Sequence, residues 1–167
     1  MRYLVTYWSQ TGNTRKVAEA IFEVLPAEKS LKPFDEVETL DGYDFIFTGF
    51  PILQFGPPPA AKIFLSTHAA GKNIAMFVTH AIPGANPQQQ VMLGKELGRC
   101  RSAFAKSEIL GLFHCQGELS EKAANELIST NIPMLMEFAA MRPLTIGHPN
   151  PAELEQARVF ANAVIKI

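Results

Sequence analysis

The sequence predicts an α/β fold in which helices cover a parallel β-sheet. Short apolar runs alternate with longer amphipathic segments along the chain, as in successive strand–helix units. The run Phe45–Gly49 is apolar at both odd and even positions, which is typical of a strand buried on both faces. The chain has 167 residues, of which 47% are hydrophobic, so it can bury a sizeable core. We therefore expect a single domain over residues 1–167.

The first part of the chain predicts a strand, a helix and a second, interrupted strand. The strand covers Tyr3–Tyr7. The helix covers Asn13–Leu25, because apolar residues recur on one of its faces at every fourth position and Pro26 ends it. Residues Glu28–Thr39 are ambiguous, and they can hold a short strand that is interrupted near Pro33.

The middle of the chain predicts two strands with a helix between them. Phe45–Gly49 is the first of these strands, and a loop rich in Pro and Gly follows it. Pro57–Pro59 can open the helix, because proline is tolerated in a first turn, and Gly71 marks its end. Ile74–Thr79 is the next strand, and His80–Pro87 is the loop after it.

The last part of the chain predicts a fifth strand between two long helices. The helix Gln88–Lys106 turns an apolar face inward that includes Val91. The strand follows at Ile109–Phe113. The chain closes with a helix over Ala152–Lys166, for which Asn150 is the candidate N-cap.

The segment Glu121–Met141 is predicted to be helical, with a break or kink at Pro133. Its second half is rich in apolar side chains. We expect them to pack on the sheet, with docking of a partner as the alternative, because an exposed cluster of this size favours aggregation. The residues are Ile132, Met134, Leu135, Met136, Phe138 and Met141.

Charge and cysteine content exclude several classes of protein. Fifteen Lys and Arg residues stand against 16 Asp and Glu residues, which argues against a dedicated nucleic-acid binder. No apolar run approaches the ~20 residues that span a bilayer, and the N-terminus lacks a secretory signal, so we expect a soluble, cytoplasmic protein with no membrane segment. Cys100 and Cys115 fit neither a disulfide framework nor a zinc site, so we expect buried thiols and no metal.

The strongest functional signal lies between the first strand and the first helix. A glycine and several hydroxyl and amide residues here lead directly into a helix N-terminus, whose free N–H groups and positive dipole end favour a phosphate. A Walker A loop would need a lysine where Asn13 stands, and a dinucleotide fingerprint would need three glycines where only Gly12 is present. A simple helix cap would need only one such residue. The predicted phosphate-binding residues are Ser9, Gln10, Thr11, Gly12, Asn13 and Thr14.

The segment Tyr7–Thr14, continued into the helix as far as Ile21, resembles the phosphate loop of flavodoxins, which bind flavin mononucleotide (FMN). The resemblance extends over nearly the whole chain through the order of elements. It implies a flavodoxin-like three-layer sandwich: a five-stranded parallel sheet in the order 2-1-3-4-5, with helices on both faces. Flavodoxin is itself the standard example of ligand binding at the switch point of such a sheet, so this placement comes from the resemblance. FMN is the implied cofactor, bound noncovalently.

The same resemblance implies that the loops after the third and fourth strands enclose the flavin ring. The first loop contributes Pro51, Ile52, Leu53, Gln54, Phe55 and Gly56, and the second contributes Thr79, His80, Ala81 and Gly84. Neither loop contains the Trp or Tyr that often stacks on the ring in flavodoxins. Trp8 can compensate for this or cover the sheet edge or a partner site. For His80 we expect a solvated side chain, with a hydrogen bond to the ring as the alternative.

Acidic residues are distributed unusually for this family. No Asp or Glu occurs between Phe45 and Lys95, a span that includes both ring loops. Carboxylates near the ring disfavour the anionic hydroquinone through like-charge repulsion. We therefore expect a less negative hydroquinone potential than that of a typical acidic flavodoxin.

Three functions remain open, and the first is favoured. An FMN-binding electron carrier would shuttle electrons between redox partner proteins, a reductase and an acceptor, and would need no catalytic side chain. An FMN-dependent NAD(P)H reductase would act on a quinone or another small acceptor. A flavin-free binding module would use the fold alone.

Overall fold

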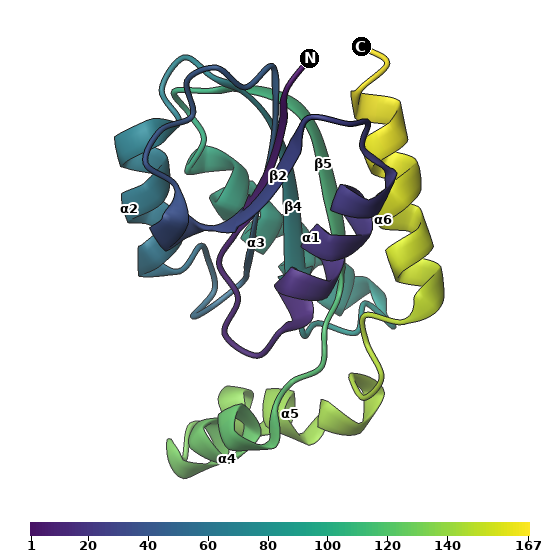
Figure 1. The fold of residues 1–167 in the computed structure, drawn as a ribbon. Coiled ribbons are helices and arrows are strands. Elements are labelled where there is room, and N and C mark those ends of the chain that lie inside the picture. The colour runs from purple at the N-terminus through teal and green to yellow at the C-terminus, as the bar shows by residue number, and fades with distance from the viewer.

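The computed structural model describes residues 1–167 and contains one five-stranded, fully parallel sheet (Figure 1). The strand order is β2-β1-β3-β4-β5, which confirms the expected fold. Each strand pairs in continuous register with its neighbours, apart from a shift between Ile74 and Ala75 where β4 meets β5. The strands are β1 (Tyr3–Tyr7), β2 (Lys29–Pro33), β3 (Phe45–Pro51), β4 (Asn73–His80) and β5 (Glu108–Gln116).

Four helices form the outer two layers. In Figure 1, α1 (Asn13–Val24) and α6 (Pro151–Val164) lie on one face of the sheet, and α2 (Pro59–His68) and α3 (Pro87–Ser102) lie on the other. The chain runs outward from β1 to β2 and then in the opposite direction from β3 to β5. Because parallel crossovers are right-handed, this reversal places the two sets of helices on opposite faces. The switch point therefore lies between β1 and β3.

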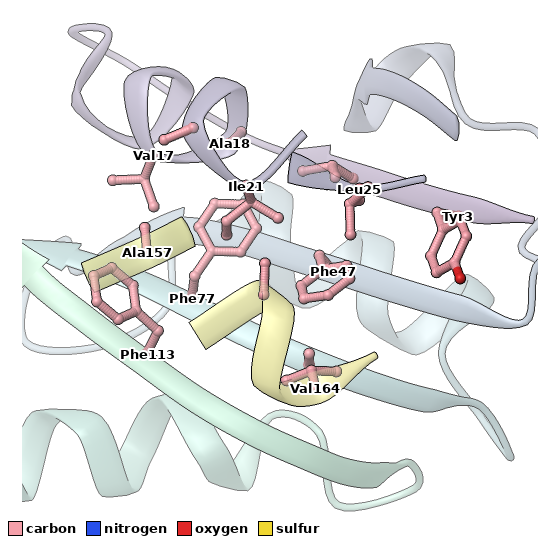
Figure 2. Packing of buried hydrophobic residues seen from close by; sticks show 14 of the residues in the cluster. Tyr3, Val17, Ala18, Ile21, Leu25, Phe47, Phe77, Phe113, Ala157 and Val164 are labelled. Atoms are coloured by element: carbon pink, nitrogen blue, oxygen red, sulfur yellow. The ribbon is translucent and has the colours of Figure 1, made fainter. Parts of the chain in front are cut away.

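The core between the sheet and the α1–α6 layer is built from apolar side chains of both (Figure 2). Val17 and Ile21 of α1 are fully buried, as are Phe47 and Phe77 of the central strands. Val164 of α6 completes the packing. The four-residue periodicity of α1 therefore predicted its buried face correctly.

A second core lies between the sheet and the α2–α3 layer. Ile46, Phe50 and Met76 point into it from β3 and β4. The ring of Phe50 stacks on Phe104, at a centroid distance of 5.9 Å. Adjacent strand residues thus enter opposite cores, which explains why these strands are apolar at every position.

The α6 helix begins as the sequence predicts. Asn150 is the N-cap, and its side-chain oxygen accepts a hydrogen bond from the N–H of Glu153. The carboxylate of Glu153 in turn accepts from the N–H of Asn150, which completes a capping box.

Two predictions of burial are wrong. Val91 is 59% exposed, because α3 turns it outward. Pro133 breaks the segment after β5 into α4 (Glu121–Ser129) and α5 (Pro133–Ala140), which pack on each other and project beyond the sheet at the end opposite the termini (Figure 1). None of the apolar residues expected to pack on the sheet belongs to either core, namely Ile132, Met134, Leu135, Met136, Phe138 and Met141.

No helix of the structure meets the length and hydropathy needed to cross a bilayer.

Gly49 should be the most sensitive glycine of the sheet. It pairs with Phe77, and a Cβ atom added at Gly49 would lie 2.0–2.3 Å from atoms of the Phe77 ring. We expect Gly49→Ala to lower the free energy of unfolding by about 3 kcal/mol, measured by urea denaturation. Gly94→Ala in α3 has open space around the new methyl group and should be neutral or stabilising by up to ~1 kcal/mol. Equal effects of the two changes would contradict this packing.

Candidate functional site

The loop after β1 turns sharply into α1 at Gly12. Gly12 is the N-cap of the helix and has φ of +95°, in the left-handed region where glycine is favoured. The Ser9 hydroxyl oxygen accepts a hydrogen bond from the N–H of Gly12 at 3.1 Å and a longer one from Arg15 at 3.4 Å. Ser9 therefore holds the loop closed over the first turn of α1.

Between residues 10 and 14, four backbone N–H groups donate to no group in the protein. They belong to Gln10, Thr11, Asn13 and Thr14, on either side of Gly12. Thr14 is only 1% exposed, so its N–H is a buried donor without an acceptor. Unpaired donors at the positive end of a helix dipole form a site for an anion.

Two side chains of this loop fasten it to the ends of other strands. The Thr14 hydroxyl shares a buried hydrogen bond of 2.8 Å with the Thr79 hydroxyl in β4. The Asn13 side-chain amide donates to the carbonyl of Glu118, after β5, at 2.9 Å. Gly117 leaves room for that amide, because a Cβ atom there would lie 2.7 Å from Asn13 Nδ2. The Thr14 hydroxyl thus has a partner within the protein, whereas the Ser9 hydroxyl accepts from two amides and donates to no group.

The carboxyl ends of β3, β4 and β5 meet this loop in one small cleft, which we call the β-end cleft. Its volume is about 80 Å³. From the predicted set it is lined by Gln10, Thr11, Asn13, Pro51, Ile52, Leu53, Thr79, His80 and Ala81. The sequence analysis missed the lining residues contributed by the segment after β5, namely Gly117, Glu118, Leu119, Ser120 and Ala123. Gly117, which directly follows the last strand, was the only available signal for them.

The remaining residues of the predicted ring loops lie outside the cleft. Gln54 and Phe55 form a tight turn with φ of +48° and +66°, and Phe55 is 42% exposed. The turn is closed by hydrogen bonds between Leu53 and Gly56, and the Phe55 carbonyl accepts from Arg99. Gln54, Phe55, Gly56 and Gly84 are absent from the lining.

His80 is buried, contrary to the expectation of a solvated side chain. It is 7% exposed because β4 extends through it, so the residue belongs to the strand and not to the loop. Its Nε2 lies 3.2 Å from His114 Nδ1, and its own Nδ1 has no partner. Burial, reinforced by the neighbouring His114, lowers the pKa of His80 to about 4. The imidazole at the cleft is therefore neutral at pH 7.

Folding brings one carboxylate to the cleft despite the acid-free span in the sequence. Glu118 lies far outside that span and lines the cleft from the end of β5. Its Oε1 is 3.4 Å from Arg142 Nη2, so a positive charge partly compensates it.

The two thiols are buried as expected, and burial raises the pKa of both Cys100 and Cys115 to about 12.

The α4–α5 pair begins directly at the rim of the β-end cleft. Leu119, Ser120 and Ala123 line the cleft, and the helices then lead away from the sheet (Figure 1). Large apolar side chains are exposed along this pair and the turn that follows it: Ile128, Ile132, Met134, Met136, Leu144 and Ile146. We call these six residues the apolar arm.

Comparison with known proteins gives relatives over the full length of the chain. The flavodoxin-like domain-containing protein BilS of Clostridioides difficile is 28% identical over 177 residues, which cover 99% of this chain and 98% of BilS. Oxidised flavodoxin 2 of Bacillus cereus superimposes with a TM-score of 0.57 and 18% identity, and 99% of each chain is covered. A flavoprotein of Lactobacillus acidophilus, solved in complex with FMN, gives a TM-score of 0.51 at 19% identity and covers 68% of this chain and 92% of its own.

The structural likenesses, at these low identities, establish the fold alone. The sequence carries the assignment further, since the model of the flavodoxin domain matches residues 4–162. The chain therefore belongs to the flavodoxin-domain family.

Proposed function

We propose that the protein binds FMN, with the phosphate on the loop at Gly12 and the flavin ring at the β-end cleft. One observation carries this proposal. The unpaired N–H groups of Gln10, Thr11, Asn13 and Thr14 surround a left-handed glycine at the switch point of the sheet, where the ends of three further strands converge. Such donors suit a phosphate dianion. Family membership and the FMN complex of the Lactobacillus acidophilus flavoprotein favour FMN as the molecule that contains this phosphate.

The ring end of the site fits a flavin only if the loop after β3 moves. The cleft of about 80 Å³ is smaller than the ~300–1,000 Å³ of ordinary small-molecule pockets. Gln54 and Phe55 hold left-handed conformations that cost non-glycine residues roughly 1–2 kcal/mol each. Rearrangement of this turn would relieve that strain and widen the cleft. The exposed ring of Phe55 is then available to cover the flavin.

We further propose that the bound protein acts as an electron carrier. FMN supplies the redox chemistry, and the chain positions it and sets the charge around it. His80 offers a neutral imidazole with an unpaired Nδ1 at the cleft. Glu118 and Arg142 provide one charge of each sign beside it. The apolar arm at the rim offers partner proteins a surface next to the flavin.

The NAD(P)H reductase is the alternative to this carrier. The two are separated by mixing the FMN-loaded protein with NADPH or NADH in the absence of any other enzyme. A carrier leaves the absorbance of the nicotinamide at 340 nm (roughly the maximum of its reduced form) unchanged beyond the rate of free FMN. Rapid turnover by the purified protein would instead establish the reductase.

Gly12 provides the sharpest test of the phosphate site. We expect Gly12→Asp to abolish retention of FMN, because the new carboxylate faces the phosphate within the ring of free amides. The measurement is the visible absorption of the protein after incubation with FMN and removal of the excess. Gly71→Asp is the matched control, since Gly71 also has positive φ and open space but lies after α2. Loss of FMN in both variants, or in neither, would contradict the site.

Glu118 and Arg142 should shift the reduction potential of bound FMN in opposite directions. Removal of the carboxylate in Glu118→Gln stabilises the negative charge of the reduced flavin and raises the potential, on the order of tens of millivolts. Arg142→Gln removes the positive charge that compensates Glu118, and it therefore lowers the reduction potential of bound FMN. Spectroelectrochemical titration of both variants measures the shifts. Shifts of the same sign, or none, would show that these charges do not act on the flavin.

A further inference from the structure

A second and larger cleft lies on the α2 side of the phosphate loop. Its volume is about 740 Å³, within the range of ordinary small-molecule sites. Trp8, Ser9 and Gly12 form one wall, and α2 forms the opposite wall. We call it the α2 cleft. Only the loop at Gly12 separates it from the β-end cleft, whose lining includes the other side of the same loop.

The α2 cleft exists because the connection from β2 to β3 contains no α-helix. Consecutive parallel strands of one sheet are usually joined by a crossover with a helix that covers the sheet. Here the connection contains only the short 3-10 turn η1 (Phe34–Glu36). Residues of η1 and α2 therefore line the α2 cleft together with the loop at Gly12.

Aromatic and apolar side chains line the α2 cleft beside polar ones, which include Thr67 and His68. The rings of Phe34 and Phe64 stack at a centroid distance of 4.1 Å and an interplanar angle of 4°. Trp8 lies beside them and is partly buried against the same core. Ile63 also lines the cleft and is 67% exposed, an unfavourable position for a large apolar side chain without a partner. These surfaces suit a planar ring system.

The lining of the α2 cleft contains one permanent positive charge. Arg15 is the only lysine or arginine in its lining, and it stands in the first turn of α1, at the positive end of the helix dipole. Its Nε donates to Glu19, so its two terminal Nη groups remain unpaired. The one carboxylate of the lining, Asp35, belongs to η1. An acidic group on a ligand would thus bind at Arg15.

We propose that the α2 cleft binds a planar aromatic molecule with a single acidic group. The ring lies against Trp8, Phe34 and Phe64, and the acid is bound by Arg15. This ligand is distinct from FMN, because Gln10, Thr11 and Asn13, three of the residues with unpaired amides, line the β-end cleft and not the α2 cleft, while the Gly12 amide is already bound to Ser9. The site does not depend on FMN binding, and its test is separate from that of the proposed function.

Trp8 makes this site directly observable, because it is the only tryptophan in the chain. Its indole N–H gives a single cross-peak in a proton–nitrogen correlation NMR spectrum. We would titrate the ¹⁵N-labelled protein with 2-naphthoate and with the neutral 2-naphthamide, first without flavin and then after saturation with FMN. The proposal predicts a saturable shift of the indole signal with naphthoate and about tenfold weaker binding of naphthamide, the size of one charge-assisted hydrogen bond.

Two variants test whether 2-naphthoate binds in the α2 cleft. Arg15→Gln should reduce the affinity for naphthoate to that for naphthamide, and the exposed position of Arg15 makes a folding defect unexpected. Ala60→Glu places a carboxylate in the α2 cleft and should abolish binding of naphthoate. Ala140→Glu on the exposed surface of α5 is the matched control and should bind like the unaltered protein.

Several results would overturn the proposal. An indole signal that does not shift, or equal affinities for the acid and the amide, would exclude an aromatic acid from this cleft. Binding of naphthoate that is lost on saturation with FMN would assign the α2 cleft to the flavin itself. Equal loss in the Ala60→Glu and Ala140→Glu variants would place the probe elsewhere. Retention of FMN by the Gly12 loop is measured separately through the Gly12→Asp variant, so failure of this proposal and failure of the proposed function can be told apart.

Discussion

The unpaired amides at the start of α1 are the constraint around which the rest of the site is arranged. A helix that begins at a left-handed glycine leaves its first N–H groups without acceptors, here those of Asn13 and Thr14, and the amides of Gln10 and Thr11 before the glycine are also unpaired. Burying donors in this way costs free energy unless an anion satisfies them. The hydrogen bonds from Thr14 to Thr79 and from Asn13 to Glu118 hold the loop in this conformation, so the ends of β4 and β5 stabilise the donor arrangement.

The topology then determines what else can reach those donors. The reversal of strand order between β1 and β3 gathers the carboxyl ends of β3, β4 and β5 on one side of the loop. On the other side, the missing helix between β2 and β3 leaves an aromatic cleft with Arg15 at its end. One loop thus separates two sites of different character. The α4–α5 pair adds a third feature, an exposed apolar surface that starts at the rim of the β-end cleft.

Local patterns predicted most of the fold, and long-range contacts explain what they missed. The sequence indicated the four helices of the outer layers and four of the five strands, because burial on both faces and helical periodicity are local signals. The segment that contains β2 was ambiguous, because this half-buried edge strand lacks an apolar run. The loop at Gly12 was likewise predicted from residues that are adjacent in the sequence. Glu118 was not, because only folding brings the end of β5 to Asn13. The burial of His80 depends on an extension of β4 that pairs with Gln116. The apolar residues after Pro133 looked like core, but their helix packs on α4 and lies beyond the sheet.

In the proposed complex, the loop at Gly12 holds the phosphate of FMN. The most direct test compares the affinity of the protein for FMN and for riboflavin, which carries the same ring without the phosphate, by calorimetric titration. Charged hydrogen bonds contribute about 1.5–3 kcal/mol each, so at least two of the four amides acting on the phosphate give FMN an advantage of about 100-fold or more. Equal affinities for the two flavins would contradict the account, because the free amides would then have no part in binding.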